Sequence, residues 1–186
     1  MSDTDIINTA QQDFNCISKK RRILSLVLYI VITAVLTQID QITKYIAEQR
    51  LYNKPDFVII KDVLHLTYLR NNGSAFGMFS GKINAFLVLT VIMICLITYV
   101  VLKMPLIIKY IPVYITCILL AAGAIGNFID RVRFGYVRDF IYFKIINFPV
   151  FNVADCYVTV SVIIFIIIIL FVYKNEDDFA FLSLKK

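Results

Sequence analysis

Two aspartates, Asp139 and Asp155, stand just before a strongly apolar run, residues 157–173. An ionised carboxylate at the edge of a bilayer is costly to maintain, so such a residue is a functional candidate. The two lie sixteen positions apart, and a bend at the intervening Pro149 would bring their side chains together. Facing carboxylates share one proton, because like charges at short range cannot both ionise. The pair therefore predicts a general acid and a general base that act without metal or cofactor.

The composition is that of a membrane protein. Of the 186 residues, 60% are hydrophobic, and the mean hydropathy of +0.78 is far above that of an ordinary soluble domain. The net charge is +6, but the basic residues fall at the ends of apolar runs, which favours lipid head groups over nucleic acid as their partners. The four cysteines are scattered without paired spacing, so neither a disulfide framework nor a zinc site is indicated.

Four apolar stretches are long enough, or nearly so, to cross a bilayer as helices, and none has a charged residue in its interior. They are residues 23–39, 83–102, 111–129 and 157–173. The first is too long for a signal-peptide core and no small-residue cleavage site follows it, so we expect it to be retained. We predict an all-α membrane protein with one four-helix domain at residues 19–175, a disordered N-terminus at 1–18 and a tail at 176–186.

The orientation rests on one basic cluster. Residues 19–22 read Lys-Lys-Arg-Arg directly before the first stretch, which places the N-terminus in the cytoplasm by the positive-inside rule. Four spans return the C-terminus to the same side. The basic residues in total divide nine inside to ten outside, so their sum does not decide the orientation.

The two outer segments have distinct patterns. Residues 58–70 are rich in β-branched and aromatic side chains and end in the turn-like 71–74, which predicts one or two strands. Residues 130–152 interleave aromatic and basic side chains, which is typical of a segment lying in the interface plane. We therefore expect a small extracytoplasmic β-region and an interfacial segment beside the four transmembrane helices.

Other chemistries are poorly supported. The single histidine, His65, lies in the strand-like run, so a three-histidine metal site is impossible, and no HExxH motif is present. We expect His65 to be structural. Gly123 and Gly126 have the spacing that lets helices pack closely, rather than that of a phosphate-binding loop. Carboxylate chemistry at the outer membrane surface remains.

Four sequence blocks resemble the lipoprotein signal peptidases, the bacterial signal peptidase II family. They are residues 40–44 (DQITK), 71–77 (NNGSAFG), 126–131 (GNFIDR), and 137–140 (VRDF) together with 151–155 (FNVAD). Their order, spacing and position relative to the four spans match across residues 20–173. Ser74, where the family usually has alanine, and the charged tail are small departures from the pattern.

The resemblance implies an aspartyl endopeptidase of the bacterial cytoplasmic membrane, which cleaves prolipoproteins before their lipidated cysteine. It implies Asp139 and Asp155 as the catalytic dyad, with the active site near the extracytoplasmic face and both termini cytoplasmic. The implied partners are prolipoprotein signal peptides and membrane lipids, with no cofactor, no metal and no nucleic acid, and the family inhibitor globomycin is expected to block the enzyme. Which aspartate is the base stays open, because a coupled pair titrates as a unit.

Supporting positions also follow from the resemblance. Asn71, Asn127, Arg131 and Asn152 match family positions that line the site, where amides and a guanidinium can bond substrate and orient carboxylates. Asp40 and Lys44 are one helical turn apart, so a local ion pair accounts for them, and they could also brace the helix end beside the site.

The same residues also have purely structural explanations. The dyad residues could be helix N-caps or ion-pair partners of Arg131 or Arg138, and Asp155 would suit an N-cap even as a catalytic residue. We expect Asp130, next to Arg131, to be structural. The aromatic residues Phe76, Phe79 and Phe140 could contact lipid or acyl chains.

Two other classes of function stay open on the sequence. A small proton-coupled carrier would use intramembrane aspartates as relays, but such groups usually lie near the midplane on broken helices, whereas here every acidic residue lies at or beyond a predicted helix end. A nonenzymatic membrane assembly factor is the third class. Only a peptidase would shorten a lipidated prolipoprotein.

Overall fold

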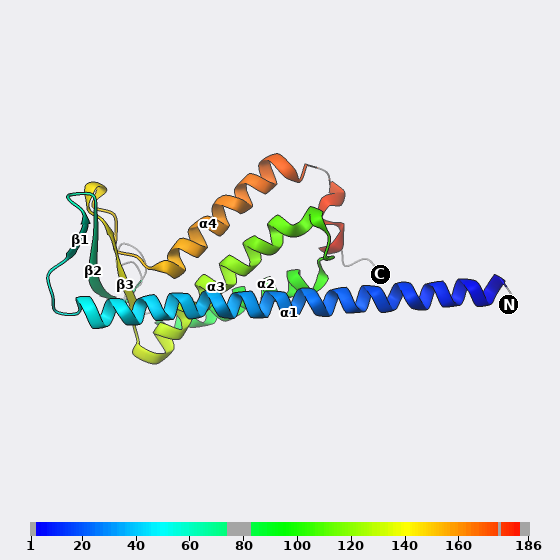
Figure 1. Cartoon of the computed structure of the whole chain (residues 1–186), viewed down its shortest axis with the longest axis horizontal. Coiled ribbons are helices and arrows are strands. Elements are labelled where there is room, and N and C mark those ends of the chain that lie inside the picture. Colours follow the sequence, from blue (N-terminus) through cyan, green and yellow to red (C-terminus); the bar gives the residue numbers. More distant parts are fainter. Residues whose placement is uncertain (1–2, 74–82, 175, 183–186) are drawn as a thin grey trace.

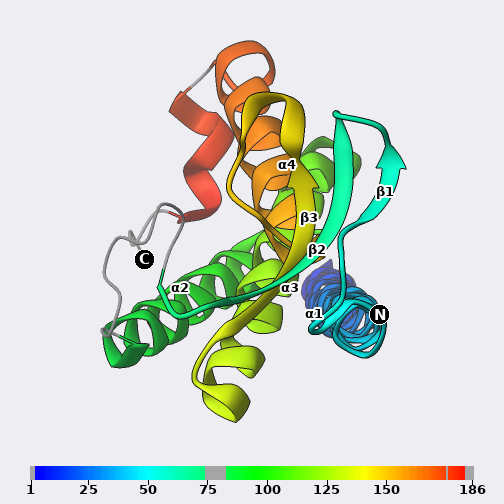
Figure 2. The same cartoon turned by 90° about the vertical axis from the view of Figure 1, so that its left-hand side faces the viewer.

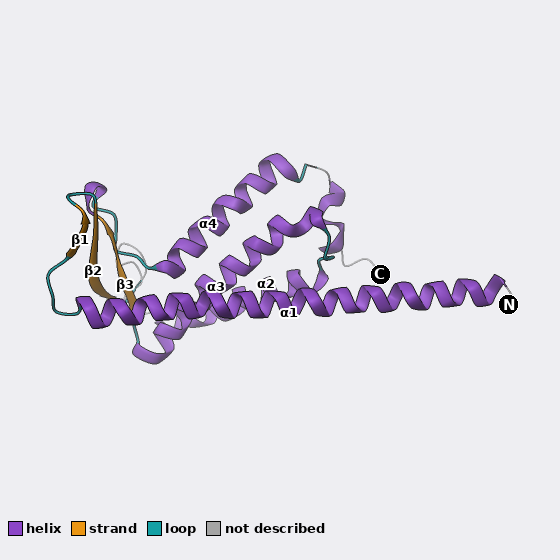
Figure 3. Ribbon diagram, viewed as in Figure 1, coloured by secondary structure: helices purple, strands orange, loops and turns teal. Residues whose placement is uncertain are grey.

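Four long helices and a small sheet make up the molecule, and all three strands lie at one end of the helices (Figures 1 and 3). The computed structural model describes residues 3–73, 83–174 and 176–182. The helices are α1 (Asp3–Leu51), α2 (Ile83–Lys103), α3 (Ile111–Phe134) and α4 (Val153–Ile167), which continues as the π-helical turn η4 (Ile168–Val172). All four are long and apolar enough to span a membrane. The predicted fold class of four transmembrane helices with a small β-region is confirmed.

The helices extend beyond the predicted apolar stretches. On the side of the sheet, α1 continues to Leu51 and α3 to Phe134, so Asp40, Lys44 and Asp130 lie inside regular helices rather than in loops. At the other end, α1 begins at Asp3, where the sequence analysis expected disorder. Residues 3–22 contain no glycine or proline, so nothing in the sequence stops the helix there. The C-terminal segment forms a short helix, η5 (Glu176–Leu182).

Helix α3 is the centre of the bundle. Half of the residues in its apolar window are buried (50%), against 11% in those of α2 and α4, and the end-on view shows α3 between the other helices (Figure 2). A Cβ atom at Gly123 would lie 2.5 Å from the Ala154 carbonyl oxygen, and one at Gly126 would lie 2.5 Å from Asp40 Oδ2. The predicted close packing is confirmed, because only glycine lets α4 and the Asp40 side chain approach α3 this closely.

The sheet is antiparallel, in the order β1 (Phe57–Ile60), β2 (Leu64–Asn71) and β3 (Val137–Phe143). The strands predicted within residues 58–70 are present. The outer segment 130–152 contains β3, which pairs with β2 along its length, and the short helix η3 (Lys144–Ile146). Large apolar side chains are exposed at Phe143, Ile145, Ile146 and Phe148. Strand pairing satisfies the backbone polar groups of this segment.

The opposite end of the bundle is closed by η5, which lies away from the sheet (Figure 1). The Lys109 ammonium in the short helix η2 (Ile108–Tyr110) lies 2.6 Å from Asp178 Oδ1, and the Tyr110 hydroxyl donates to the Asp178 carbonyl oxygen at 3.0 Å. Phe179 and Phe181 pack against the apolar core beside these bonds. The sheet end and the η5 end therefore mark the two sides of the membrane.

Candidate active site

A reversal of the chain after β3 brings Asp155 back to Asp139. The Phe151 carbonyl oxygen accepts the backbone N–H groups of Phe140 and Ile141 at 2.9 and 2.8 Å, and the Phe151 N–H donates to the Ile141 carbonyl oxygen at 3.0 Å. These bonds hold the returning segment against β3, after the turn at Asn147. The start of α4 consequently lies beside the middle of β3.

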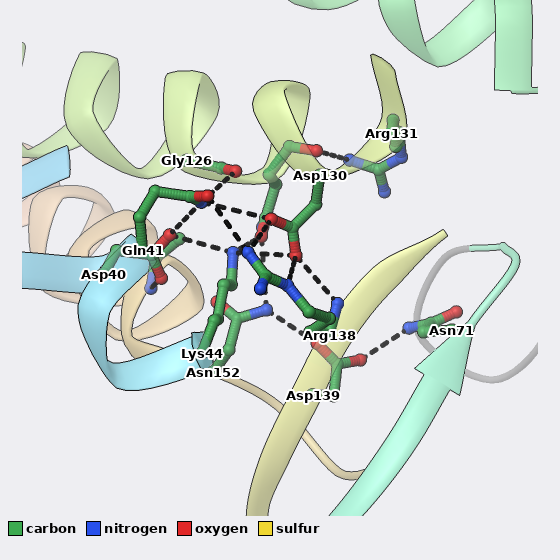
Figure 4. A network of polar contacts seen from close by, with 12 residues as sticks. Asp40, Gln41, Lys44, Asn71, Gly126, Asp130, Arg131, Arg138, Asp139 and Asn152 are labelled. Carbon is green, nitrogen blue, oxygen red and sulfur yellow. Dashed lines mark hydrogen bonds and ion pairs between the residues drawn. The ribbon is translucent and has the colours of Figure 1, made fainter. Parts of the chain in front are cut away.

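Asp139 is buried, and both of its carboxylate oxygens accept amide N–H groups. Asn71 Nδ2, at the end of β2, lies 2.8 Å from Oδ2, and Asn152 Nδ2 lies 2.6 Å from Oδ1 (Figure 4). Burial raises the pKa of Asp139 to about 7, and the nearby charge of Asp155 adds to the effect against the two amide bonds, which lower it. At neutral pH this carboxyl therefore holds its proton for a large part of the time.

Asp155 lies in the first turn of α4. Asn152 is the N-cap, its Oδ1 accepts the Asp155 N–H at 3.1 Å, and the Asp155 carboxylate accepts the Asn152 N–H at 3.0 Å in return, which completes a capping box. Asn127 Nδ2 donates to the other Asp155 oxygen at 2.8 Å. The expectation that Asp155 could be the N-cap was wrong, because the extended backbone of Asn152 makes that residue the cap and leaves Asp155 three positions inside.

The two carboxylates contact amides and not cations. Asn152 donates to both of them, from its side-chain amide to Asp139 and from its backbone N–H to Asp155. No salt bridge to either carboxylate is found among the described residues. Arg138, one of the two expected ion-pair partners, bonds Asp130 instead. The other, Arg131, donates from both terminal nitrogens to the carbonyl oxygens of Asn127 and Gly73, each at 3.4 Å. The ion-pair reading of the dyad is therefore not what the structure shows.

A pocket of about 720 Å³ opens onto this pair. Its polar lining combines Asp139 and Asp155 with three neighbours from β2 and α3, namely Asn71, Asn127 and Arg131. Its apolar lining comes from the β3–α4 connection and one face of α4: Phe143, Ile146, Phe148, Pro149, Val150, Phe151, Val158 and Val160. The pocket is thus an apolar cavity with a few converging polar groups, the usual form of a binding site.

Beside the pocket lies a second polar group, which we call the charge cluster: Asp40, Gln41, Lys44, Asp130 and Arg138 (Figure 4). Lys44 Nζ lies 2.9 Å from Asp40 Oδ2 and 3.7 Å from Asp130 Oδ2, and all three side chains are fully buried. Arg138 bonds Asp130 through its backbone N–H, Nε and a terminal nitrogen at 2.9, 3.2 and 2.8 Å. The predicted Asp40–Lys44 ion pair is confirmed.

Three members of this region were not predicted as site residues from the sequence: Gln41, Glu48 and Arg138. Gln41 donates to Asp40, Asp130 and the Gly126 carbonyl oxygen at 3.1 Å each, and Glu48 accepts from Arg138 at 3.3 Å. The sequence could have indicated the two residues on α1, because Gln41, Lys44 and Glu48 share one helix face at i, i+3 and i+7. Arg138 gave no such signal, because its partners depend on how β3 leaves α3.

Other predicted positions fall outside the site. His65 is buried in β2 with Nδ1 3.4 Å from Asp56 Oδ2, and it does not line the pocket. Phe140 is buried against Ala47 and Leu51, so the expected lipid contact was wrong for this residue. Residues 74–82, which include Ser74, Phe76 and Phe79, lie outside the described part of the chain.

A family of known proteins matches this chain. The family model described as signal peptidase (SPase) II matches residues 32–171, most of the chain. The chain belongs to the signal peptidase II family. Membership makes it a protease that acts on signal peptides.

Related proteins and solved structures agree. The chain is 46% identical over 136 residues to a lipoprotein signal peptidase of Caldanaerobacter subterraneus, covering 73% of this chain and 90% of that protein. It is 44% identical over 146 residues to one of Enterococcus faecalis, covering 78% and 89%. Two bacterial membrane enzymes solved by the in meso method share the fold, with TM-scores of 0.67 and 0.68 at 34% and 36% identity, covering 86% and 78% of this chain and 93% and 94% of theirs. The signal peptidase II chain is thus a multi-pass bacterial membrane protein.

Proposed function

We propose that this protein is an aspartyl endopeptidase that removes the signal peptide from prolipoproteins by cutting before the lipidated cysteine. One observation carries the proposal: the carboxylates of Asp139 and Asp155 both accept from Asn152, through its side-chain amide and its backbone N–H, and both line one pocket without a cationic partner among the described residues. The names of the related lipoprotein signal peptidases support this substrate class.

The mechanism needs one proton on the pair. Asp139, with its pKa near 7, holds that proton, and ionised Asp155 takes a proton from a water molecule, whose oxygen attacks the scissile carbonyl. Asp139 donates its proton to the carbonyl oxygen, which gives a neutral tetrahedral diol. Asp155 then passes its proton to the leaving amine while Asp139 recovers one from a hydroxyl, so the C–N bond breaks and the pair returns to its starting state.

The supporting residues have separate roles in this proposal. Asn71, Asn127 and Asn152 hold the two carboxylates in place through N–H groups. Arg131 lines the pocket. Its bonds to two carbonyl oxygens hold the guanidinium at the wall where a peptide backbone would lie. Asp40 and Lys44 connect α1 to the start of α4 and to α3 beside the site, through the Ala154 N–H and Asp130.

The pocket lining suits a lipidated, apolar substrate. Phe143, Phe148 and Val158 are among its apolar side chains, and α4 presents Val160 both to the pocket and to the exposed surface. A signal peptide and acyl chains in the bilayer could enter along this face. With the basic cluster before the first span in the cytoplasm, the site lies near the extracytoplasmic face and both termini are cytoplasmic.

The test is cleavage by the purified, detergent-solubilised protein. A synthetic prolipoprotein peptide is supplied with and without a diacylglyceryl group on its cysteine, and products are identified by mass. We expect cleavage only before the modified cysteine, inhibition by globomycin, and no product with Asp139→Asn or Asp155→Asn. Equal cleavage of both peptides would contradict the substrate class, and turnover by either variant near the wild-type rate would contradict the aspartyl mechanism.

A further inference from the structure

Each of the three asparagines around the dyad has its carbonyl oxygen bonded to a donor. The Gly73 N–H donates to Asn71 Oδ1 at 3.0 Å, and the Asp155 N–H donates to Asn152 Oδ1 at 3.1 Å. Asn127 Oδ1 accepts Lys44 Nζ at 2.8 Å. Because an amide can exchange its oxygen and nitrogen by a half turn, these donors decide that the NH₂ group of each asparagine faces a carboxylate.

The donors to Asn71 Oδ1 and Asn152 Oδ1 are backbone groups, whereas Asn127 Oδ1 accepts from two side chains, Asn152 and, at the shorter distance, Lys44. Its ammonium is fully buried, and Asp40 at 2.9 Å already compensates its charge. The bond to Asn127 Oδ1 is shorter than the 3.2 Å bond that the same oxygen accepts from Asn152 Nδ2. The ion pair with Asp40 therefore does not account for the contact between Lys44 and Asn127.

We propose that Lys44 is a positioning residue that acts on the reaction through the Asn127 amide. This inference rests on the function proposed above. The ammonium fixes and polarises this amide, so that Asn127 Nδ2 holds Asp155 Oδ1 at 2.8 Å in a constant direction. A turned amide would place Oδ1 against the Asp155 carboxylate and Nδ2 against the ammonium, with repulsion at both ends. Lys44 does not touch the pocket, so it cannot bind substrate itself.

A merely structural lysine predicts a different result. If Lys44 only neutralised Asp40, removing both charges together would restore the site, because a buried ion pair replaced as a unit by neutral side chains often costs little stability. If Lys44 orients Asn127, the loss remains after Asp40 is neutralised. Outer partners of functional side chains typically contribute 10- to 100-fold to activity.

The experiment compares Asp40→Asn with Asp40→Asn/Lys44→Met in the full-length enzyme, using the lipidated peptide and thermal unfolding of each variant. We expect both to fold, with kcat roughly 10- to 100-fold lower in the double variant and KM unchanged. Asn127→Ala is then added to both backgrounds. Lys44→Met should then lower kcat much less in the presence of Asn127→Ala than in Asp40→Asn alone, because the proposed effect of the lysine passes through that amide.

Three outcomes decide the matter. Equal kcat for Asp40→Asn and Asp40→Asn/Lys44→Met would overturn the proposal, and so would independent, multiplicative losses from Lys44→Met and Asn127→Ala. If the methionine variant does not fold, the same cycle is run with Lys44→Leu, which also lacks an N–H donor, and the same non-additivity is required. Absence of cleavage by the wild-type enzyme would instead refute the proposed function, so the two failures are distinguishable.

Discussion

The aspartates at the sheet end of the helices fall into two pairs with opposite surroundings. Asp40 and Asp130 are fully buried and bond the cations Lys44 and Arg138 at 2.9 and 2.8 Å. Asp139 and Asp155 are bonded by asparagine amides and backbone N–H groups, and they line the pocket. The same side chain therefore occupies a charge-paired environment in one set and an amide-lined environment in the other.

The difference explains which pair can do chemistry. Pairing with a buried cation favours the ionised form of a carboxylate, and this pairing is lost if the group takes up a proton, which opposes proton exchange during turnover. Amide donors fix the direction of a carboxylate without imposing a full charge, and a second carboxylate nearby makes the pair share a proton. The charge cluster thus joins α1, α3 and β3, while the dyad stays free to titrate.

The largest effect should follow from the dyad. Asp139→Asn and Asp155→Asn each remove a proton-carrying group but keep its size, and loss of general acid–base function costs about 10²- to 10⁴-fold in rate. Because the two act as a unit, the double variant should be scarcely slower than either single one. Rate losses that multiply in the double variant would show that the two aspartates act independently.

Arg138→Met should mainly affect stability. It leaves Asp130 and Glu48 without their guanidinium partner, and breaking a buried pair by removing one member costs roughly 3–5 kcal/mol. The unfolding midpoint in detergent measures the loss. Arg133→Met is the matched control, because Arg133 is exposed in the last turn of α3, before the chain enters β3, and should change the midpoint little.

The pH dependence separates the pairs in a second way. Burial raises the pKa of Asp139 to about 7, so this carboxyl is protonated below that pH and loses its proton above it. A mechanism that needs one proton on the pair predicts that kcat falls about tenfold per pH unit on the alkaline side. Asp40→Asn should keep the same alkaline limb, and a flat rate between pH 7 and 9 would contradict the proton-sharing account.

The smallest predicted effect tests the edge of the charge cluster. The Tyr68 hydroxyl donates to Glu48 Oε1 at 3.0 Å, on the carboxylate that also binds Arg138. Tyr68→Phe should lower the free energy of unfolding by about 1 kcal/mol. Tyr142→Phe removes an exposed hydroxyl bond to Asn147 and should cost less, so equal losses would mean that Glu48 has no special role.

Much of this arrangement was accessible from the sequence. The apolar runs predicted the four spans because helix length and bilayer thickness are linked. The chain reversal expected between Asp139 and Asp155 is present, with its turn at Asn147 rather than at Pro149. The Asp40–Lys44 pair followed from helical spacing alone. These features depend on contacts that are local in the chain or constrained by the membrane.

The rest depends on contacts between distant segments. Arg138 finds Asp130 only because Gly135, in a left-handed conformation at φ 76°, ends α3 and turns the chain into β3. The pairing of β3 with β2 aligns Asn71 with Val137, which places the Asn71 amide on Asp139. Sheet register and helix-to-strand turns are set by tertiary packing, so the charge cluster could not be predicted in detail.

The most direct test converts each of the four aspartates to asparagine and measures kcat and the unfolding midpoint on the same preparations. Asp139→Asn and Asp155→Asn should lose turnover and keep their midpoints. Because the raised pKa of Asp139 means that its ionised form is disfavoured in the folded state, Asp139→Asn should be no less stable than wild type above pH 7. Asp40→Asn and Asp130→Asn should lose stability and keep detectable turnover. If Asp40→Asn or Asp130→Asn abolished turnover at an unchanged midpoint while a dyad variant remained active, the division of the aspartates into structural and catalytic pairs would be wrong.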